Sequence, residues 1–350
     1  MVDHVKKLDE GFTLAQLLKF MSAIDAQPNW RGPATMACDY YDGDQLNDRV
    51  RAVLTARGQP EVIHNLIGPT VDGVLGMEAK TRSSLAVNAD DDDGEDLALV
   101  LNEKFSDAWR LANGDRACSD AYASMVKAGM GWVEVQRDSN PFNPAYKIKF
   151  IHRRNIWWDW HSTEIDMNDS RWKIHKKWMD LDEAQATFPD HKEILKNSVN
   201  QWEDFARTDD HDNDSSNLHA AWHDYDSWDR KHSEWMDTER ERVLLQVVMY
   251  KIFVRAHVFK LKSGRVIEFD EKNHIHVAAA NSGKVNIEFA VFPKYREAWF
   301  VGPHRIIDRF SSIPDGKDNL VGFVGYRKDK SGEPYGLVSR MIPAQDGINA

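Results

Sequence analysis

Apolar residues recur at helical spacing through much of residues 1–131. Positions three and four apart share one face of a helix, so this spacing predicts amphipathic helices. The first predicted helix has its apolar face at Leu14, Leu17, Leu18 and Met21. A second, over Leu97–Leu111, has its apolar face at Leu97, Leu101, Phe105 and Ala108. With a third helix over Ala117–Lys127, we expect a helical N-terminal part.

Two further segments of this part are predicted to be helical. Asp44 is the expected N-cap of one helix. This helix ends before Gly58 and carries apolar residues at Leu46, Val50, Val53 and Leu54. The other segment, Val62–Ala79, is interrupted by Gly68 and Pro69. Because proline breaks or bends a helix, we expect two short helices or one kinked helix there.

The period changes from helical to alternating where the N-terminal part ends. Trp132–Val135 and Tyr146–Phe150 alternate in polarity, which is typical of strands, and the residues between them favour a turn. Another strand is expected over residues 172–179, followed by a short helix at Leu181–Phe188. We therefore expect residues 132–240 to form an α/β part.

Residues 241–335 are predicted to be rich in strands, because β-branched and aromatic residues dominate their apolar runs. Val243–Lys260 is expected to form one long strand or two, and a hairpin turn leads from it into Val266–Phe269. Two more strands are expected at Val285–Phe289 and Ala298–Val301. The fold class expected for the whole chain is α+β.

The closing residues, 336–350, are predicted to turn into a helix. We expect the chain to pass into a helix from about Leu337 onward, and Pro343 fits if the regular helix begins at that residue. Proline is tolerated there because the first turn of a helix does not use its missing N–H. The helix is expected to continue beyond Ala350 in the complete protein.

Composition favours a folded protein of two or three domains. The chain has 350 residues, of which 42% are hydrophobic and 29% are charged, so it can bury a core. It has no apolar run of roughly 18 residues, the length that predicts a membrane span. The N-terminus lacks a signal-peptide pattern, so we expect synthesis in the cytoplasm and no membrane partner. Cys38 and Cys118 are expected to be reduced thiols.

The charge balance disfavours a protein that grips nucleic acid tightly. Forty-five basic side chains against 56 acidic ones give a net charge of −11. The nearest approach to a basic cluster is Lys173, Lys176 and Lys177, and it is followed by Asp180 and Asp182. We expect a dissociation constant for duplex DNA on the order of 10⁻⁴ M at physiological salt.

One group of residues resembles part of a sugar-binding cleft. Asp159 and Glu164 are carboxylates beside the aromatic residues Trp157, Trp158 and Trp160. A pair of carboxylates flanks the bond that glycoside hydrolases cleave. The simpler interpretation, which we favour, is a strand end that packs its aromatic residues and leads into an acidic loop.

Two other groups resemble metal sites but depart from them at required positions. His219 and His223 have the spacing of a zinc peptidase, but Ala220 stands where the catalytic glutamate belongs. Asp210, Asp212 and Asp214 imitate the start of a calcium loop that needs glycine and glutamate later. Phosphate-binding loops and nucleophile elbows are also missing from the sequence. We therefore expect no enzyme activity, no cofactor and no metal.

Several separated segments resemble the portal proteins of short-tailed double-stranded DNA bacteriophages. The resemblance spans nearly the whole chain in order, and its weight comes from the order and spacing of the segments. The segments are Tyr40–Leu46, Arg57–Pro60, Asn65–Ile67, Gly129–Trp132, Asn155–Asp159 with its acidic loop to Asp169, Phe323–Arg327, Pro334–Gly336 and Gln345–Asn349. The chain departs from the family pattern at Trp160 and at Gly347.

The resemblance implies a ring-forming portal fold at one vertex of a virion capsid, dodecameric in the family. Residues 1–131, 132–240 and 241–335 would be parts of the outer wing. Gln345, Ile348 and Asn349 would start the stem helix, and most of the stem and the clip would follow residue 350. The implied partners are the large terminase subunit, tail adaptor or head-completion proteins, major capsid and scaffolding proteins, and the double-stranded DNA passing through the channel during packaging and ejection.

The tryptophan-rich segment has two open interpretations. Trp222, Trp228 and Trp235 fit a subunit interface, since tryptophan is enriched at interfaces, and they fit a buried core about equally well. Two other function classes also remain open. One is a carbohydrate-binding or glycoside-hydrolysing phage component that uses Asp159 and Glu164, and the other is a scaffold protein that forms no ring.

Overall fold

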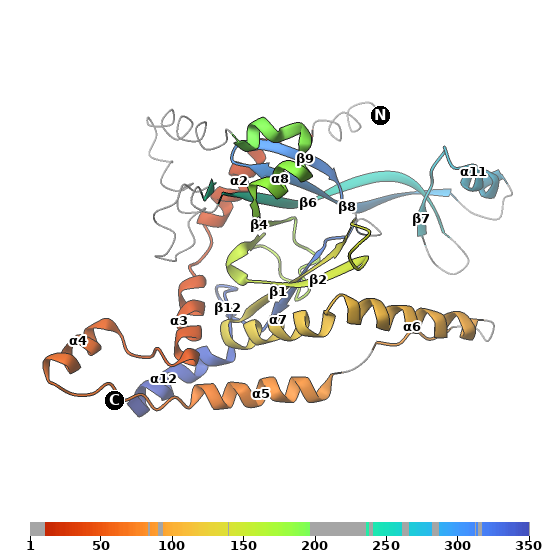
Figure 1. Cartoon of the computed structure of the whole chain (residues 1–350). Helices are drawn as coiled ribbons and strands as arrows, with labels where there is room; N and C mark the ends of the chain where they lie inside the picture. Colours follow the sequence, from red (N-terminus) through yellow and green to blue (C-terminus); the bar gives the residue numbers. More distant parts are fainter. Residues whose placement is uncertain are drawn as a thin grey trace.

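The computed structural model describes residues 11–82, 85–89, 94–138, 140–196, 236–237, 241–260, 266–281, 287–311, 313 and 317–349. Helices and antiparallel sheets are both present, which confirms the predicted α+β class. Sheets occupy the upper half of the view in Figure 1, and long helices lie beneath them. Within the described residues, no helix is both long and apolar enough to cross a membrane.

The described chain before residue 130 is helical, as predicted. The helices are α2 (Leu14–Asp25), α3 (Arg31–Asp42), α4 (Asp48–Ala56), α5 (Ile67–Thr81), α6 (Glu95–Leu111) and α7 (Gly114–Ala128). Thr13 and Gln16 form a capping box at the start of α2, in which the Thr13 N–H donates to Gln16 Oε1 at 2.8 Å. Such a box satisfies N–H groups that the first helical turn leaves unpaired.

Two details of the helical part differ from the prediction. The N-cap of α4 is Asn47, whose side chain accepts a hydrogen bond from the Arg49 N–H, whereas Asp44 forms an ion pair with Arg51. Residues 62–66 are not helical, and a single helix, α5, begins at Ile67. Pro69 lies in the first turn of α5, where its missing N–H costs no hydrogen bond.

The larger sheet has seven strands and is antiparallel throughout. Its main path runs through β3 (Ile156–Trp158), β4 (Trp172–Asp180), β6 (Arg242–Lys260), β8 (Ile287–Val301) and β9 (His304–Phe310). Two short strands, β5 (Met236–Asp237) and β7 (Val266–Glu268), also pair with β6. β6 is one long strand, and β8 replaces the two short strands that the sequence predicted.

The smaller sheet places β1 (Met130–Arg137) between β10 (Leu320–Val324) and β2 (Tyr146–Ile151). The strands β11 (Tyr326–Arg327) and β12 (Pro334–Tyr335) form a separate pair. The remaining elements are α8 (Leu181–Thr187), α11 (His274–Asn281), α12 (Leu337–Asn349) and the 3₁₀ turns Arg153–Asn155 and Pro189–His191. β1, β2, β4 and α8 were predicted, whereas β9 to β12 and α11 were not.

Consecutive tryptophans of β3 belong to two different cores. Successive side chains of a strand point to opposite faces, so Trp157 and Trp158 face away from each other. Trp157 packs in a core under α2, with Phe12, Leu17, Met21, Trp172, Ile174, Leu244, Val248, Ala298 and Phe300. Trp158 packs in a core under α3, with Trp30, Ala34, Ala128, Met130, Trp132, Ile156, Met167 and Leu320. β3 therefore lies between the core of the larger sheet and that of the smaller one.

The closing helix packs against the helical part, although the two are far apart in sequence. Val338 of α12 is buried in a cluster with Ala37 of α3, Ile67 and Val71 of α5, and Val126 of α7. In Figure 1, α12 lies beside α3 and α5 near the C-terminus. The helical layer is thus completed by the last described residues of the chain.

The backbone of α7 approaches β1 closely at Gly131. A Cβ atom at this position would lie 2.1 Å from the carbonyl oxygen of Ala121 in α7. Replacing Gly131 with alanine is therefore expected to lower the free energy of unfolding by about 1–3 kcal/mol, because the strand and helix must move apart. Urea denaturation measures this loss.

Gly73 of α5 provides the matched control, because a Cβ there would meet no atom within 4 Å. Gly73→Ala should raise the free energy of unfolding by about 0.5–1 kcal/mol through helix propensity. A Gly131→Ala protein as stable as the parent would contradict the close approach of α7 to β1.

Candidate functional site

A buried ion pair joins the two sheets. Lys173 of β4 is only 2% exposed, and its Nζ lies 2.6 Å from Asp318 Oδ2, in the segment that leads into β10. The same ammonium group donates to the Leu320 carbonyl at 3.0 Å. The Leu320 N–H in turn donates to Asp318 Oδ1 at 3.0 Å, so the carboxylate is held from two sides.

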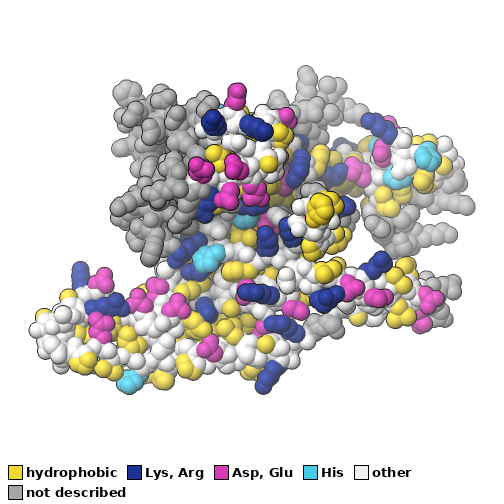
Figure 2. Space-filling view, viewed as in Figure 1, with side chains coloured by type: hydrophobic (Ala, Val, Ile, Leu, Met, Phe, Trp, Pro, Cys, Tyr) yellow, Lys and Arg dark blue, Asp and Glu magenta, His cyan; other side chains and the backbone are white. Residues whose placement is uncertain are grey.

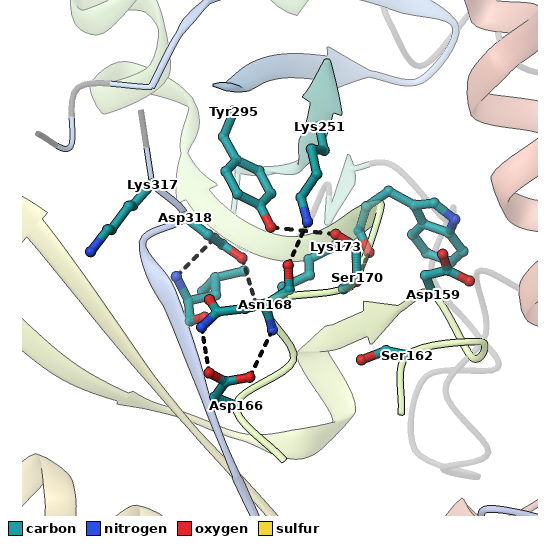
Figure 3. Close-up of polar contacts among 12 residues, drawn as sticks. Asp159, Ser162, Asp166, Asn168, Ser170, Lys173, Lys251, Tyr295, Lys317 and Asp318 are labelled. Carbon is teal, nitrogen blue, oxygen red and sulfur yellow. Dashed lines mark hydrogen bonds and ion pairs between the residues drawn. The ribbon is translucent and has the colours of Figure 1, made fainter. Parts of the chain in front are cut away.

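The loop between β3 and β4 is fastened to the long strands of the larger sheet. Figure 3 shows Lys251 of β6 and Tyr295 of β8 pointing toward this loop. The Lys251 ammonium donates to the Asn168 carbonyl, and the Tyr295 hydroxyl donates to the Ser170 carbonyl at 3.3 Å. Burial lowers the pKa of Lys251, since a charged ammonium loses solvation there.

Asp169 organises the inside of the same loop. Its carboxylate accepts hydrogen bonds from the Ser162 hydroxyl at 2.5 Å and from the Thr163 N–H at 2.6 Å. Burial opposes ionisation of this group, but the hydrogen bonds outweigh burial and lower the pKa of Asp169 to about 2. The acidic loop thus has a defined conformation, built around an ionised carboxylate.

A second buried pair crosses between the sheets beside the first. His175 Nδ1 of β4 lies 3.5 Å from Glu134 Oε1 of β1, and both side chains are almost fully buried. Burial disfavours the ionised carboxylate, yet hydrogen bonding and charge attraction from His175 keep the pKa of Glu134 below its usual value. Lys173, His175, Glu134 and Asp318 therefore form a buried polar contact between the two sheets.

The three lysines nearest to a basic cluster do not form a surface for DNA. Lys173 forms its ion pair with Asp318. Lys176 is 7% exposed, and its ammonium group lies 4.2 Å from the centroid of the Trp157 ring. Only Lys177 is partly exposed. Lys173 and Lys176 therefore contact other elements of the chain.

The residues of the sugar-binding alternative are not arranged as a cleft. Asp159 lies on the wall of an open pocket of about 710 Å³, but Glu164 does not line it. Both Asp159 oxygens accept hydrogen bonds from backbone N–H groups, of His161 at 3.2 Å and of Arg171 at 3.4 Å. Trp157 and Trp158 are buried, so neither offers a face to a sugar. This geometry gives the alternative no support.

A second polar cluster, which we call the terminal clasp, surrounds Gln345 of α12. Gln345 is 2% exposed; its Oε1 accepts from the Leu66 N–H at 3.1 Å and its Nε2 donates to the His64 carbonyl at 2.7 Å. Asn349 accepts from the His64 N–H at 3.2 Å and donates to Gln45 Oε1 at 2.6 Å. The clasp therefore fixes the chain that enters α5 against α12.

The clasp has a further contact at the next residue of α12, Asp346. The Tyr40 hydroxyl of α3 donates to Asp346 Oδ1 at 2.7 Å. This hydrogen bond, together with burial, raises the pKa of Tyr40 to about 12. Ile348, in contrast, is 47% exposed and contributes little to the clasp.

Pro343 is placed differently from the prediction. The helix begins at Leu337, as predicted, but Pro343 lies inside α12 and not in its first turn. Proline in a helix interior cannot donate the bond to the carbonyl four residues earlier. The packing of Val338 and the bonds of Gln345 on either side of Pro343 stabilise the helix despite that loss.

Comparison with known proteins gives the family. A sequence model of the phage P22-like portal proteins matches residues 17–350. The chain belongs to this family. It is also similar to the portal protein of Helicobacter pylori bacteriophage KHP30, with 25% identity over 151 residues. That similarity covers 42% of this chain and 24% of the relative, so the match spans about a quarter of the relative's length.

The other candidate site residues identified in the sequence of this portal family member lie outside the described residues. These are Trp222, Trp228 and Trp235, the histidines His219 and His223, and the acidic run with Asp210, Asp212 and Asp214. In the part of the chain that the structure describes, no three His, Cys, Asp or Glu side chains are grouped to hold a metal ion.

The buried pairs of Lys173 with Asp318 and of His175 with Glu134 were not predicted from the sequence. A signal for them was present, because charged residues alternate with Trp172 and Ile174 in one strand and so give that strand a polar face.

The ion pair between the sheets leads to a stability prediction. Lys173→Met should lower the free energy of unfolding by about 3–5 kcal/mol, because it leaves the Asp318 carboxylate buried without its partner. Adding Asp318→Asn removes that charge and should recover part of the loss. Chemical denaturation of the two variants measures both effects.

Lys317→Met is the control, because Lys317 is exposed next to Asp318 and points away from it in Figure 3. Its effect should stay within about 0.5 kcal/mol. If Lys317→Met and Lys173→Met were equally stable, the ion pair would not hold the sheets together.

The terminal clasp leads to a second prediction. Gln345→Ala should cost about 1–3 kcal/mol, since it leaves the Leu66 N–H and the His64 carbonyl without their partner. Hydrogen exchange should also become faster at the Leu66 amide. Ile348→Ala, on the exposed side of the same helix, should change neither quantity. Unchanged exchange at Leu66 in Gln345→Ala would show that α12 does not hold this segment.

Proposed function

We propose that the chain is the wing of a portal ring, the oligomer through which double-stranded DNA enters and leaves a phage capsid. The observation that carries the proposal is the portal family match over residues 17–350. In this proposal the ring occupies one capsid vertex in the virion and is assembled in the host cytoplasm. It contains twelve copies of the chain. Closed rings form when one surface patch of a subunit binds a different patch of the next.

Successive parts of the chain would make up the wing. Residues 1–131, 132–240 and 241–335 form its helical, α/β and β-rich parts. Gln345, Ile348 and Asn349 then begin the stem helix. The terminal clasp supports this assignment, because it anchors α12 in the helical layer and so gives a stem helix a fixed base.

The role is mechanical, and the family is structural. We propose that the ring docks the large terminase subunit during packaging, then tail adaptor or head-completion proteins, and that it contacts major capsid and scaffolding proteins. An acidic chain with a net charge of −11 suits a conduit, because tight phosphate contacts would have to break as DNA advances. The tryptophans Trp222, Trp228 and Trp235 remain candidates for a subunit interface.

Electron microscopy and native mass measurement of the complete protein test the proposal. We expect closed rings with cyclic symmetry, most often of twelve copies. Monomers or dimers under all assembly conditions would count against the portal role. A monomer whose melting temperature rises with added oligosaccharide would instead favour the sugar-binding alternative.

A further inference from the structure

A two-stranded arm extends from the body of the molecule. The pairing of β4 with β6 ends at Trp172 and Tyr250, and that of β9 with β8 ends at Phe310 and Arg296. Beyond these points β6 and β8 pair mainly with each other, and Figure 1 shows them leaving the sheet toward β7 and α11. We call residues 251–260 and 287–295 the arm.

One face of the arm is apolar and exposed. The register places His257 opposite Phe289 and Arg255 opposite Val291, so these side chains share a face with Phe253 and Ile287. Phe253, Val291, Phe289 and Ile287 are 68%, 65%, 58% and 41% exposed. Monomeric soluble proteins rarely expose such a continuous apolar row, so this face is a candidate for contact with a partner.

The same face is cationic. The Arg255 guanidinium lies 5.1 Å from the centroid of the Phe289 ring, and the His257 ring lies 3.8 Å from it. The structure describes all of residues 251–259 and 287–295. None of them places a carboxylate side chain on this face. A partner for the arm should therefore combine apolar side chains with acidic ones.

Helix α6 presents that combination. Leu97, Val100, Leu101 and Phe105 follow helical spacing along one side and are 62%, 47%, 42% and 38% exposed. Of the residues of α6 only Ala98 is buried, so the apolar face that the sequence predicted is not covered by the described part of its own chain. Figure 2 shows hydrophobic and acidic side chains together along this helix.

Acidic residues border the apolar stripe of α6. Asp96, Glu103 and Asp107 are seven and four residues apart, so they lie on one side of the helix, next to Val100. Lys104 interrupts the stripe, but its long aliphatic stem can cover apolar surface while its amine reaches water. The stripe and its border thus match the arm in both polarity and charge.

We propose that the arm of one copy packs its apolar, cationic face on the α6 stripe of a second copy of this chain. The occupant rests on the proposed function, since a closed ring needs two different complementary patches on every subunit. Both patches are exposed in one chain, so they do not cover each other within it. A thin ribbon with an apolar face is marginal alone, and the contact would also stabilise the arm.

Assembly of full-length variants tests the contact. Phe253→Ser with Phe289→Ser changes the arm, and Leu101→Ser with Phe105→Ser changes α6. Each pair should shift the midpoint concentration of assembly, measured by analytical ultracentrifugation, upward by about tenfold or more. Phe142→Ser is the control, because Phe142 is 96% exposed on a turn outside both patches and should leave the midpoint unchanged.

A charge reversal tests the pairing of the two patches. Arg255→Glu alone, and Asp96→Lys with Glu103→Lys alone, should each weaken assembly. Combining all three should restore assembly toward the parent, whereas independent sites would give additive losses. Thermal melting of the dissociated variants should match the parent, because all the changed side chains are exposed.

Each outcome has a separate meaning. Rings that assemble equally well with the arm and α6 variants overturn this inference and leave the portal proposal intact. Non-ring oligomers that depend on the arm and α6 support the inference and contradict the ring. Arm variants that assemble normally but lose affinity for a labelled DNA duplex identify a nucleic-acid surface and overturn the inference.

Discussion

Lys173 places a primary amine in the buried space between the two sheets, where it meets the carboxylate of Asp318. A buried charge is tolerated only with a partner, so this pair constrains where the smaller sheet can lie against the larger one. The buried contact of His175 with Glu134 acts in the same place. Together with the tryptophans of β3, which face opposite cores, these contacts fix one arrangement of the two sheets.

The sequence predicted individual helices and strands better than the contacts between them. Periodicity identified α2, α6, α7, β1, β2 and β4 because each has a clear apolar pattern. It missed β9 to β12, which are short or rich in charged and glycine residues. It also could not pair Lys173 with the Leu320 region, because 147 residues separate them and no local motif marks the contact.

The candidate sites show the same limit. Gln345 and Asn349 were chosen by family resemblance, and the structure gives them buried and partly buried bonds to His64, Leu66 and Gln45. For Trp157 and Trp158 the sequence favoured packing at a strand end over a sugar-binding cleft, and the structure shows both side chains buried. For α6 the sequence predicted an apolar face, and only the fold shows that this face is exposed.

The central claim is a firmly packed wing that keeps two elements, the arm and α6, for contact with neighbouring subunits. Hydrogen exchange of the complete protein, compared between dissociated and assembled states, tests it most directly. We predict that assembly slows exchange in residues 251–260, 287–295 and 95–111, while the amides of β1 and β4 stay as they were. Protection confined to other segments, with these three unchanged, would contradict the account.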